Sequence, residues 1–505
     1  MIGNEKLSGL SRRSALAAIG GASGLFWLSP ACRAASDARR IVSVREFGAA
    51  GDGRTDDSVA FMNAMATGQD VLVPRTSRAY RVTRTLALSR PGQRVLGEEG
   101  GGRVIQAGNG ENATVFVTEH DGCEFRDLDL VPGTDVRALY QGWGVAIVGA
   151  RGGLVAGCRF SGMRRGGVLL RNANETQVIG NLFERSVVRG DGSEPQRDMG
   201  YDIFLAERSS RNLIEANRCV SGVGVGVGCQ TVTSGASQFD NIMRRNVIRN
   251  QPCYGVMVYQ SDPADQIDRF VIEQNEVDGI SGAVHTDGRT RFYGSGVYLQ
   301  TSNDFIVRRN VIRRTNFDRR LPFSDHSVPA AIAVSGVVNG TIEENQIDQC
   351  HHGIASIGGG RSTRPTDRTS ISRNVVTGAD GDGVRLLDCN SATLIENRMT
   401  GVAGRASYGV RLHRVTAPVR GGFIISGNQI ADFTVGIEAM GDGIPSVTIR
   451  GNAISGTRGM AIASSAIESI VESNDLRRSE RGVRFSQAVR RRVCSGNLHG
   501  GSLGC

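Results

Sequence analysis

A short unit built around asparagine repeats through the chain after residue 150, and it constrains the fold more than any other feature. In nearly every copy an apolar residue follows two places after the Asn. The shortest separations are 22 to 24 residues, and longer units look like the same repeat carrying insertions. Cys158, 23 residues before Asn181, fits as a first copy in which the Asn is replaced. The members are Asn181, Asn217, Asn246, Asn275, Asn310, Asn345, Asn374, Asn397, Asn428, Asn452, Asn474 and Asn497.

Each unit also contains a glycine followed by alternating apolar residues, which is typical of short strands and not of helices. Examples are residues 167–170, 255–258, 296–299, 383–386, 409–412 and 482–485. Three short strands within about 23 residues leave no room for a crossover helix. We therefore predict an all-β chain, a right-handed parallel β-helix of about 12–13 coils. In such a solenoid the stacked Asn side chains would bond to one another, so we interpret them as structural.

Paired arginines precede an apolar run near the N-terminus. Arg12 and Arg13 come before residues 17–28, and small residues follow at 31–34. This order is typical of a twin-arginine export signal removed after about residue 34. A general secretory signal and a lipoprotein signal ending at Cys32 are the alternatives. No later run has the ~20 apolar residues of a spanning helix, so we expect a periplasmic or secreted protein without an integral membrane segment.

The charge of the chain is basic and comes almost entirely from arginine. The formal net charge is +9, and loss of the predicted signal would leave +6. Lys6 is the only lysine. This balance favours an acidic partner, and an acidic polysaccharide suits an exported protein better than nucleic acid does. A solvated basic surface without a partner is the alternative.

Ten cysteines are compatible with disulfides in an exported protein. Four of them occupy or adjoin strand positions, where buried free thiols are common: Cys158, Cys219, Cys229 and Cys494. No C-x-x-C pair occurs, so we predict no zinc site. The clustered aspartates are compatible with a calcium site, although no ligand spacing demands one.

The segment VREFGAAGDGRTDDSVAF, residues 44–61, resembles the opening of the pectate-lyase-like superfamily. That superfamily includes rhamnogalacturonase-type, alginate-epimerase-type and tailspike β-helices. The resemblance continues through residues 71–74, 80–82 and 95–98. It implies a β-helix whose first coil is covered by an N-terminal capping helix. We therefore divide the chain into an export signal at 1–34, a cap with the first coils at 35–130 and β-helix repeats at 131–505.

The capping helix is expected to begin near Thr55, whose side chain could cap it. Asp56 and Asp57 would then lie in the first turn, at the positive end of the helix dipole, and are more plausible as caps than as catalysts. An apolar stripe would face the first coil, made by Val59, Met62 and Met65.

The superfamily shares a scaffold but not a reaction. The Asn-Thr-Asp, Asp-Asp and Gly-His-Gly motifs of polygalacturonase-type hydrolases do not occur after the cap. Lysine-dependent lyase chemistry is excluded because Lys6 stands alone, although arginine can serve as the base in some relatives. The epimerase motif Tyr-Gly-Phe-Asp-Pro-His is only partly present, since Tyr254-Gly255 and Asp262-Pro263 occur at another spacing and Ala264 replaces the His.

Long loops on neighbouring coils suggest a trough, because sites on solenoids are built from loops on one face. These loops are residues 186–200, 281–294 and 313–329, and the coils of Asn217 and Asn246 between them have short connections. If Val256, Val258, Val297 and Leu299 point inward, alternation turns their neighbours outward. The predicted substrate-binding floor is Gln230, Met257, Tyr259, Tyr298 and Gln300, with His326 in the adjoining loop.

The loops over this floor supply the candidate catalytic residues: Asp262, Asp265, His285, Asp287, Arg289 and Arg291. β-Elimination needs a group that neutralises the carboxylate and a base for the adjacent proton, whereas hydrolysis needs two carboxylates. His351 and His352 are further candidates, but the pair is expected to begin a later strand and to point to opposite sides, which speaks against a two-histidine metal site. The predicted function is an exported carbohydrate-active protein acting on an acidic, uronate-containing polysaccharide. Lyase chemistry stands ahead of hydrolase and epimerase chemistry. The alternative is a non-catalytic β-helix that binds or organises envelope polysaccharide.

Overall fold

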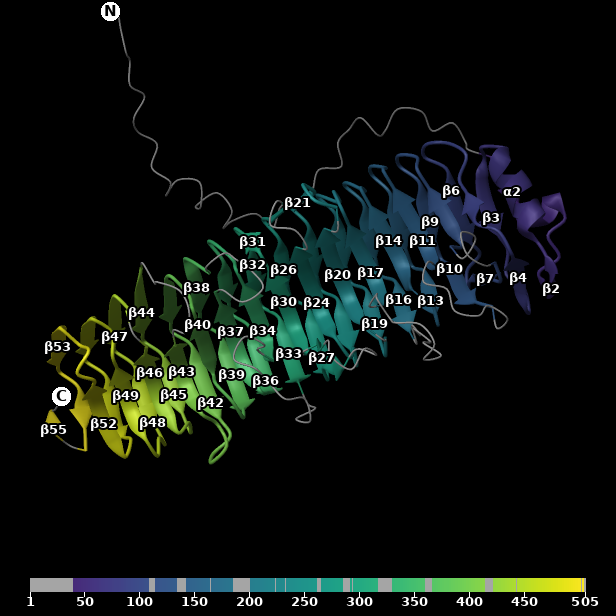
Figure 1. Cartoon of the computed structure of the whole chain (residues 1–505). Coiled ribbons are helices and arrows are strands. Elements are labelled where there is room, and N and C mark those ends of the chain that lie inside the picture. The colour runs from purple at the N-terminus through teal and green to yellow at the C-terminus, as the bar shows by residue number, and fades with distance from the viewer. Residues whose placement is uncertain are drawn as a thin grey trace, which may run out of the picture. The chain divides into compact units, whose positions relative to one another are not determined.

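The chain passes repeatedly through three parallel sheets, which we call A, B and C, and each pass adds one strand to each sheet (Figure 1). The computed structural model describes residues 40–108, 114–133, 142–163, 165–184, 200–222, 224–231, 233–260, 265–284, 291–292, 294–316, 329–358, 366–413, 421–441, 443–500 and 502–503. The solenoid lies within the compact unit Ile41–Cys505, and residues Met1–Arg40 form a separate unit. The predicted export signal at 1–34 therefore lies outside the described residues.

Sheet A has 17 strands and sheet C has 15. Sheet A contains β1 (Ile41–Ser43), β3 (Asp70–Val73), β6 (Arg94–Gly97), β9 (Glu124–Arg126), β12 (Leu154–Ala156), β15 (Gln177–Ile179), β18 (Leu213–Glu215), β22 (Ile242–Arg244), β26 (Val271–Glu273), β32 (Ile306–Arg308), β35 (Thr341–Glu343), β38 (Thr369–Ser372), β41 (Ala392–Ile395), β44 (Gly422–Ser426), β47 (Ser446–Arg450), β50 (Glu468–Glu472) and β53 (Arg491–Ser495).

Sheet B contains β2 (Asp52–Asp56), β4 (Ala79–Val82), β7 (Gly102–Gln106), β10 (Leu128–Pro132), β13 (Arg159–Ser161), β16 (Leu182–Glu184), β19 (Arg218–Val220), β23 (Val247–Arg249), β27 (Glu276–Ile280), β33 (Val311–Thr315), β36 (Gln346–Cys350), β39 (Val375–Ala379), β42 (Arg398–Gly401), β45 (Gln429–Ala431), β48 (Ala453–Ser455), β51 (Asp475–Arg478), β54 (Leu498–His499) and β55 (Ser502–Leu503), the last of which runs antiparallel to β54.

Sheet C contains β5 (Leu86–Ala87), β8 (Phe116–Thr118), β11 (Trp143–Val148), β14 (Gly166–Arg171), β17 (Tyr201–Ala206), β20 (Val225–Thr231), β24 (Tyr254–Gln260), β30 (Ser295–Gln300), β34 (Ala330–Ser335), β37 (His352–Ile357), β40 (Val384–Leu387), β43 (Tyr408–His413), β46 (Val435–Met440), β49 (Met460–Ser464) and β52 (Arg481–Phe485). Two smaller sheets are also present: β21 (Ser237–Phe239) with β25 (Gln266–Asp268) and β31 (Ser302–Asn303), and β28 (Ala283–Val284) with β29 (Arg291–Phe292).

The predicted fold is confirmed, but the predicted number of 12–13 coils is too low, because sheet A alone has one strand in each of 17 coils. The repeat count began at Cys158. In the coil before it, Leu128 occupies the equivalent position, since Asp129 pairs in register with Arg159. Leu128 is buried and apolar, so the early coils keep the geometry without the residue that marks it in the sequence.

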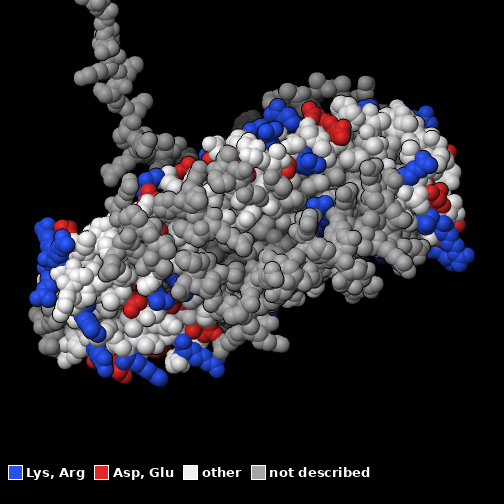
Figure 2. Space-filling view, in the orientation of Figure 1, with Lys and Arg blue, Asp and Glu red and all other residues white. Residues whose placement is uncertain are grey.

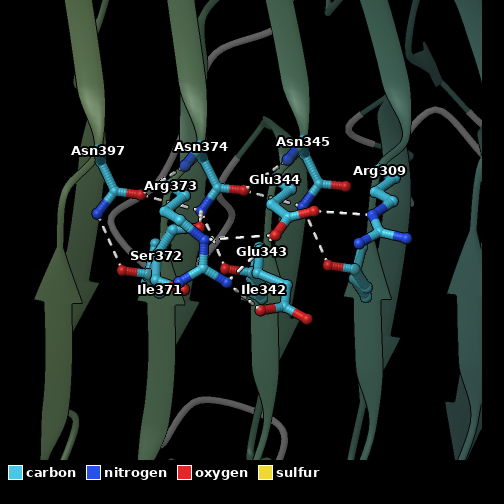
Figure 3. Close-up of polar contacts among 11 residues, drawn as sticks. Arg309, Ile342, Glu343, Glu344, Asn345, Ile371, Ser372, Arg373, Asn374 and Asn397 are labelled. Atoms are coloured by element: carbon cyan, nitrogen blue, oxygen red, sulfur yellow. Dashed lines mark hydrogen bonds and ion pairs between the residues drawn. The ribbon is translucent and has the colours of Figure 1, made fainter. Parts of the chain in front are cut away.

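The repeating asparagines form a continuous buried ladder between sheets A and B, as predicted. Each Asn offers its side-chain oxygen to the backbone N–H and the side-chain N–H of the Asn one coil earlier. Asn345 and Asn374, for example, make both bonds at 2.9–3.0 Å (Figure 3). Cys158 begins the row, because its backbone N–H donates to Asn181 Oδ1 at 2.9 Å. The ladder joins every coil from Cys158 to Asn497.

The residue just before each ladder position has a positive φ angle, which turns the chain sharply from sheet A into sheet B. Glu344 has φ 56° and Arg373 has φ 52°. Their side chains point outward, and Glu344 accepts hydrogen bonds from both Arg373 and Arg309 on the surface (Figure 3). Exposed ion pairs of this kind contribute little to stability. Of the two side-chain interactions between coils described here, we therefore expect the buried amide hydrogen bonds to stabilise the stacking more.

The capping helix is present, but its details differ from the prediction. It is α2, Ser58–Ala66, preceded by the short 3₁₀ helix η2, Val44–Phe47. The carboxylate of Asp57 accepts hydrogen bonds from the backbone N–H groups of Ala50 and Gly51, so neither it nor Thr55 caps α2 through its side chain.

The buried face of α2 also differs from the predicted stripe. Met65 is buried as expected, whereas Val59 and Met62 are 58% and 40% exposed. Phe61 occupies the interior instead and packs edge-on against Tyr80 of β4. The N-cap is Asp57 and not Thr55, and the buried face of α2 is formed by Ser58, Ala60, Phe61, Ala64 and Met65.

The core is a column of aliphatic and aromatic side chains enclosed by the three sheets. Cys158, Cys219 and Cys229 are buried free thiols there, as predicted, and burial raises the pKa of each. Cys494 differs, because it is disulfide-bonded. Within the described ranges, no helix is long and apolar enough to cross a membrane.

Candidate functional site

The predicted floor residues do lie next to one another on the outward face of sheet C. Gln230, Tyr259 and Gln300 align in register across β20, β24 and β30, and Met257 aligns with Tyr298. The alternation is as predicted, since the residues expected to point inward belong to the central core: Val256, Val258, Val297 and Leu299.

Burial separates these residues into two groups. Met257 is 1% exposed and Gln300 is 8% exposed, so neither offers a surface to a substrate, contrary to the prediction. Met257 packs in a second apolar cluster outside the central core, which also contains Trp143, Phe204 and Tyr254. The reason is that the aromatic residues of neighbouring coils line up along the same face and cover one another.

Three floor residues remain partly exposed: Gln230, Tyr259 and Tyr298. The Tyr298 hydroxyl donates to Gln300 Oε1 at 2.6 Å, and its ring stacks on Tyr254 with centroids 5.1 Å apart. This segment of sheet C therefore has a stacked, hydrogen-bonded lining in which few side chains are accessible.

Of the catalytic residues predicted over this floor, only Asp265 has a described side chain. Asp265 is fully buried, and its Oδ1 accepts a hydrogen bond from the Ala236 backbone N–H, so it joins neighbouring coils and does not line a trough. Arg291 lies in β29, which pairs antiparallel with β28, and its side chain is outside the description. The other candidates also lie outside the described residues: Asp262, His285, Asp287, Arg289 and His326. The same holds for most of the three loops predicted as walls.

A different group of polar residues converges farther along the outward face of sheet C, on β37, β40, β43 and β46 and the turns that lead into them. Ala355 pairs in register with Arg385, Arg385 with Arg411, and Arg411 with Glu438, so the last three form one column. A neighbouring column at the start of these strands contains His352, Asp382 and Tyr408. We call the following eight residues the polar site: His351, His352, Asp380, Asp382, Arg385, Tyr408, Arg411 and Glu438.

His351 and Asp380 form a hydrogen-bonded pair at the edge of the polar site. His351 lies in the turn between β36 and β37, and Asp380 occupies the same turn one coil later. Their Nδ1 and Oδ1 atoms are 2.6 Å apart, and both side chains are partly exposed. A carboxylate that holds the Nδ1 proton leaves the lone pair of a neutral imidazole on Nε2. This arrangement suits a general base.

The two histidine rings lie together, with centroids 4.2 Å apart, so the prediction that they point to opposite sides is wrong. Strand alternation does not apply to His351, because it lies in the turn before β37. Even so, the described residues contain no group of three or more His, Cys, Asp or Glu side chains that could hold a metal ion.

His352 is buried and neutral. Its Nδ1 accepts a hydrogen bond from the Asp382 backbone N–H at 2.8 Å, and Arg385 Nη1 lies 3.4 Å from its Nε2. Burial, together with the positive charges nearby, lowers the pKa of His352 well below its ordinary value. The 3.6 Å approach of His352 Nδ1 to the Asp382 carboxyl is therefore not an ion pair. The hydrogen bond to Nδ1 fixes the Asp382 backbone beside the His352 ring.

Asp382 has the most perturbed carboxyl in the polar site. Its side chain is 2% exposed, and Oδ2 has no hydrogen-bond partner, with Arg385 Nη1 3.9 Å away. Burial raises the pKa of Asp382 to about 6, although Arg385 and Arg411 oppose the shift. A carboxyl group with such a pKa holds its proton in mildly acidic solution and can act as a general acid.

Arg411 and Tyr408 form the more accessible side of the polar site. The Arg411 guanidinium lies 4.7 Å from the centre of the Tyr408 ring, and its Nε is 3.5 Å from Glu438 Oε2. Both side chains are partly exposed, whereas Arg385 is 8% exposed. An anionic substrate could approach this arginine directly.

The sequence contains a signal for the polar site that the repeat analysis missed. Residues 380–383 read Asp-Gly-Asp-Gly, and they occupy the repeat position of His351-His352-Gly353. Most other coils have apolar or aromatic residues at the start of the sheet C strand, as at Trp143 and Tyr254. The predicted site was based on long insertions, and these lie in other coils.

Comparison with known proteins agrees with the observed architecture. The family described as the right-handed beta helix region matches residues 113–294 and 362–497, which together exceed half of the chain. No curated protein sequence matches the chain significantly.

Several solved structures share the fold at low sequence identity. The Streptococcus pneumoniae surface protein and adhesin PfbA is 14% identical, with 71% of this chain and 97% of that chain covered and a TM-score of 0.53. The Azotobacter vinelandii mannuronan C-5 epimerase AlgE6 A-module is 18% identical, with coverages of 82% and 99% and a TM-score of 0.45. The Dettilon tailspike protein gp208 is 14% identical with a TM-score of 0.42, and this chain spans 66% of its length. The similarity to PfbA supports the β-helix fold of this chain.

Proposed function

Since the chain belongs to the right-handed β-helix family, we propose that it is an exported carbohydrate-active enzyme that acts on an acidic, uronate-containing polysaccharide, most simply by β-elimination. The observation that carries the proposal is the convergence of a histidine–aspartate pair, a buried acid and two arginines in the polar site. Export through the twin-arginine route would place the enzyme in the periplasm or outside the cell.

β-Elimination assigns a separate task to each part of the polar site. Arg411, with Arg385 behind it, neutralises the uronate carboxylate and so makes the adjacent C5 proton more acidic. His351 Nε2 accepts that proton, and Asp380 stabilises the imidazolium that forms. The C4–O bond then breaks, a C4=C5 double bond forms, and Asp382 donates its proton to the leaving oxygen. No water is consumed.

Hydrolysis is a second candidate, favoured by the raised pKa of Asp382. In that reaction Asp382 would protonate the glycosidic oxygen, and Glu438 would be the second carboxylate. A non-catalytic role in binding polysaccharide is the third candidate. It is favoured by the burial of His352 and Asp382. The partly exposed residues of the polar site are then His351, Asp380, Tyr408, Arg411 and Glu438.

The test uses the mature protein with polygalacturonate, alginate and glucuronan. Unsaturated-uronate absorbance, reducing ends and C5 configuration are followed together, so that elimination, hydrolysis and epimerisation give different signals. We expect absorbance and reducing ends to rise together. His351→Asn should abolish both signals, and His120→Asn, the same change in a partly exposed histidine outside the polar site, should leave them unchanged. Binding without any of the three signals would overturn the enzymatic proposal and support the binding role.

A further inference from the structure

The outward face of sheet C changes from buried to accessible at β43. On β34, β37 and β40 the outward residues are almost completely buried: Ala330, Ala333, Ala355 and Leu387. From β43 to β52, outward residues in two columns are partly or fully exposed. One column is Tyr408, Val435, Met460 and Arg481, and the other is Arg411, Glu438, Ala463 and Arg484.

These two columns continue the polar site without interruption. Arg411 pairs in register with Glu438, Glu438 with Ala463, and Ala463 with Arg484. Three steps between coils place Arg484 roughly 14 Å from Arg411 along the solenoid. Between the two arginines the neighbouring column offers Val435 and Met460, which are partly exposed and apolar. The face thus has cationic groups at both ends. Between them lie apolar side chains and the carboxylate of Glu438, whose Oε2 is 3.5 Å from Arg411 Nε.

The distal end of this face belongs to a coil that is unusually rich in arginine. Seven arginines occur between residues 477 and 492, all of them exposed, and blue side chains gather at this end of the solenoid in Figure 2. Arg477 pairs with Asp475, and Arg491 approaches Glu468. Among the described residues, no carboxylate pairs with Arg481 or Arg484, and both side chains are exposed.

We propose that an acidic polysaccharide chain lies along the outward face of sheet C from β43 to β52, with its carboxylates held by Arg411 at one end and by Arg481 and Arg484 at the other. This inference rests on the proposed function and extends it by naming the direction and length of the bound chain. A polymer suits the face better than a small anion because the cationic groups are separated by several coils. Its repeated sugar rings would pass over Val435 and Met460, which offer contacts to their apolar faces.

The test compares two double variants that remove the same charge from the same coil. The first is Arg481→Ala with Arg484→Ala. The second, the matched control, is Arg478→Ala with Arg490→Ala, which removes exposed arginines from β51 and from the turn after β52. Affinity is measured by calorimetry for polygalacturonate, alginate, short uronate oligomers and dextran sulfate, and the melting temperature confirms that both variants fold.

We expect the first variant to bind the uronate polymer about three- to tenfold more weakly, since each exposed ionic contact contributes modestly. Disaccharides, too short to span the face, should bind both variants like the unmodified protein, and the control should bind the polymer within about twofold of it. Equal weakening in both variants, for uronates and dextran sulfate alike, would show a diffuse charge effect and overturn the proposal, as would no weakening in either. If the unmodified protein binds no uronate polymer, the proposed function itself fails. If it binds the polymer and the first variant binds equally well, only the binding face proposed here fails.

Discussion

Asn345 donates its side-chain N–H to Asn374 Oδ1 at 2.9 Å, and its backbone N–H reaches the same oxygen at 3.0 Å (Figure 3). Asn374 in turn donates to the carbonyl of Ile342 and to Asn397 Oδ1. One buried side chain therefore satisfies groups from three neighbouring coils. Because the solenoid has contacts only between neighbours, these bonds carry much of the specificity of stacking.

Asn374→Ala should destabilise the solenoid strongly. The substitution leaves two buried N–H groups of Asn345 without this acceptor, whereas Asn397 Oδ1 keeps the hydrogen bond from the backbone N–H of residue 374. Each such group costs about 1–3 kcal/mol when unsatisfied, so we expect a loss of about 3 kcal/mol or more in the free energy of unfolding. Urea denaturation measures it. The control is Asn390→Ala, whose side chain makes no hydrogen bond and which should change stability by less than about 1 kcal/mol. Equal losses in the two variants would contradict the ladder's role.

Asp382→Asn should change the pH dependence of stability. The folded-state pKa of Asp382 is raised to about 6 from an ordinary value of 3.8, mainly by burial. The stability associated with its protonated form is therefore fully present below pH 3.8 and is lost as the pH rises through 6. A shift of this size corresponds to about 3 kcal/mol at pH 8. The neutral amide avoids that cost, so the variant should gain stability over the natural protein between pH 4 and pH 8 in urea denaturation. A difference that does not vary with pH would contradict the assignment.

The same carboxyl group predicts how activity varies with pH. If Asp382 donates a proton to the leaving oxygen, kcat should fall as the pH rises through about 6. Asp382→Asn should lower kcat by about a hundredfold or more, since general acid catalysis contributes about 10²–10⁴-fold. Initial rates from pH 4 to pH 9 provide the profile. Activity that is unchanged in the variant would remove Asp382 from the reaction.

Arg411→Ala should weaken both binding and catalysis. Its guanidinium is the accessible cation of the polar site and packs on Tyr408. We expect kcat/KM for a uronate polymer to fall by about a hundredfold, as found for the loss of one strong electrostatic contact to a transition state. Arg450→Ala, which changes an exposed arginine at the end of β47 in sheet A, is the charge-matched control. A substrate without carboxylates that is turned over equally by both variants would argue against a uronate.

Replacement of Arg12 and Arg13 by lysine should block export if the signal is of the twin-arginine type. The measurement is fractionation of cells that produce the tagged full-length chain, with the unsubstituted protein as the reference. Accumulation of the uncleaved precursor inside the cell is the expected result. Continued export would instead indicate the general secretory route.

Much of the fold was predictable because a stacked solenoid repeats its constraints in the sequence. The buried position of each Asn and the apolar alternation around Val256 and Val258 recur in coil after coil, so local pattern and tertiary contact coincide. The predictions failed where a tertiary contact does not follow from the local sequence pattern. Met257 alternates outward as expected but is buried by aromatic neighbours from other coils, and α2 begins at Ser58 instead of near Thr55.

The sequence by itself determined the coil, its ladder and the alternation of the strands, because these depend on residues within one repeat and its copies. Only the tertiary structure decided which coils bear the polar site. His351 and Asp380 are 29 residues apart, and they meet because parallel stacking places one turn above the other. The raised pKa of Asp382 likewise arises from burial against residues of adjacent coils. Such contacts depend on how many residues each coil contains, because that number decides which residues of neighbouring coils are stacked. The sequence of one repeat alone does not contain this information.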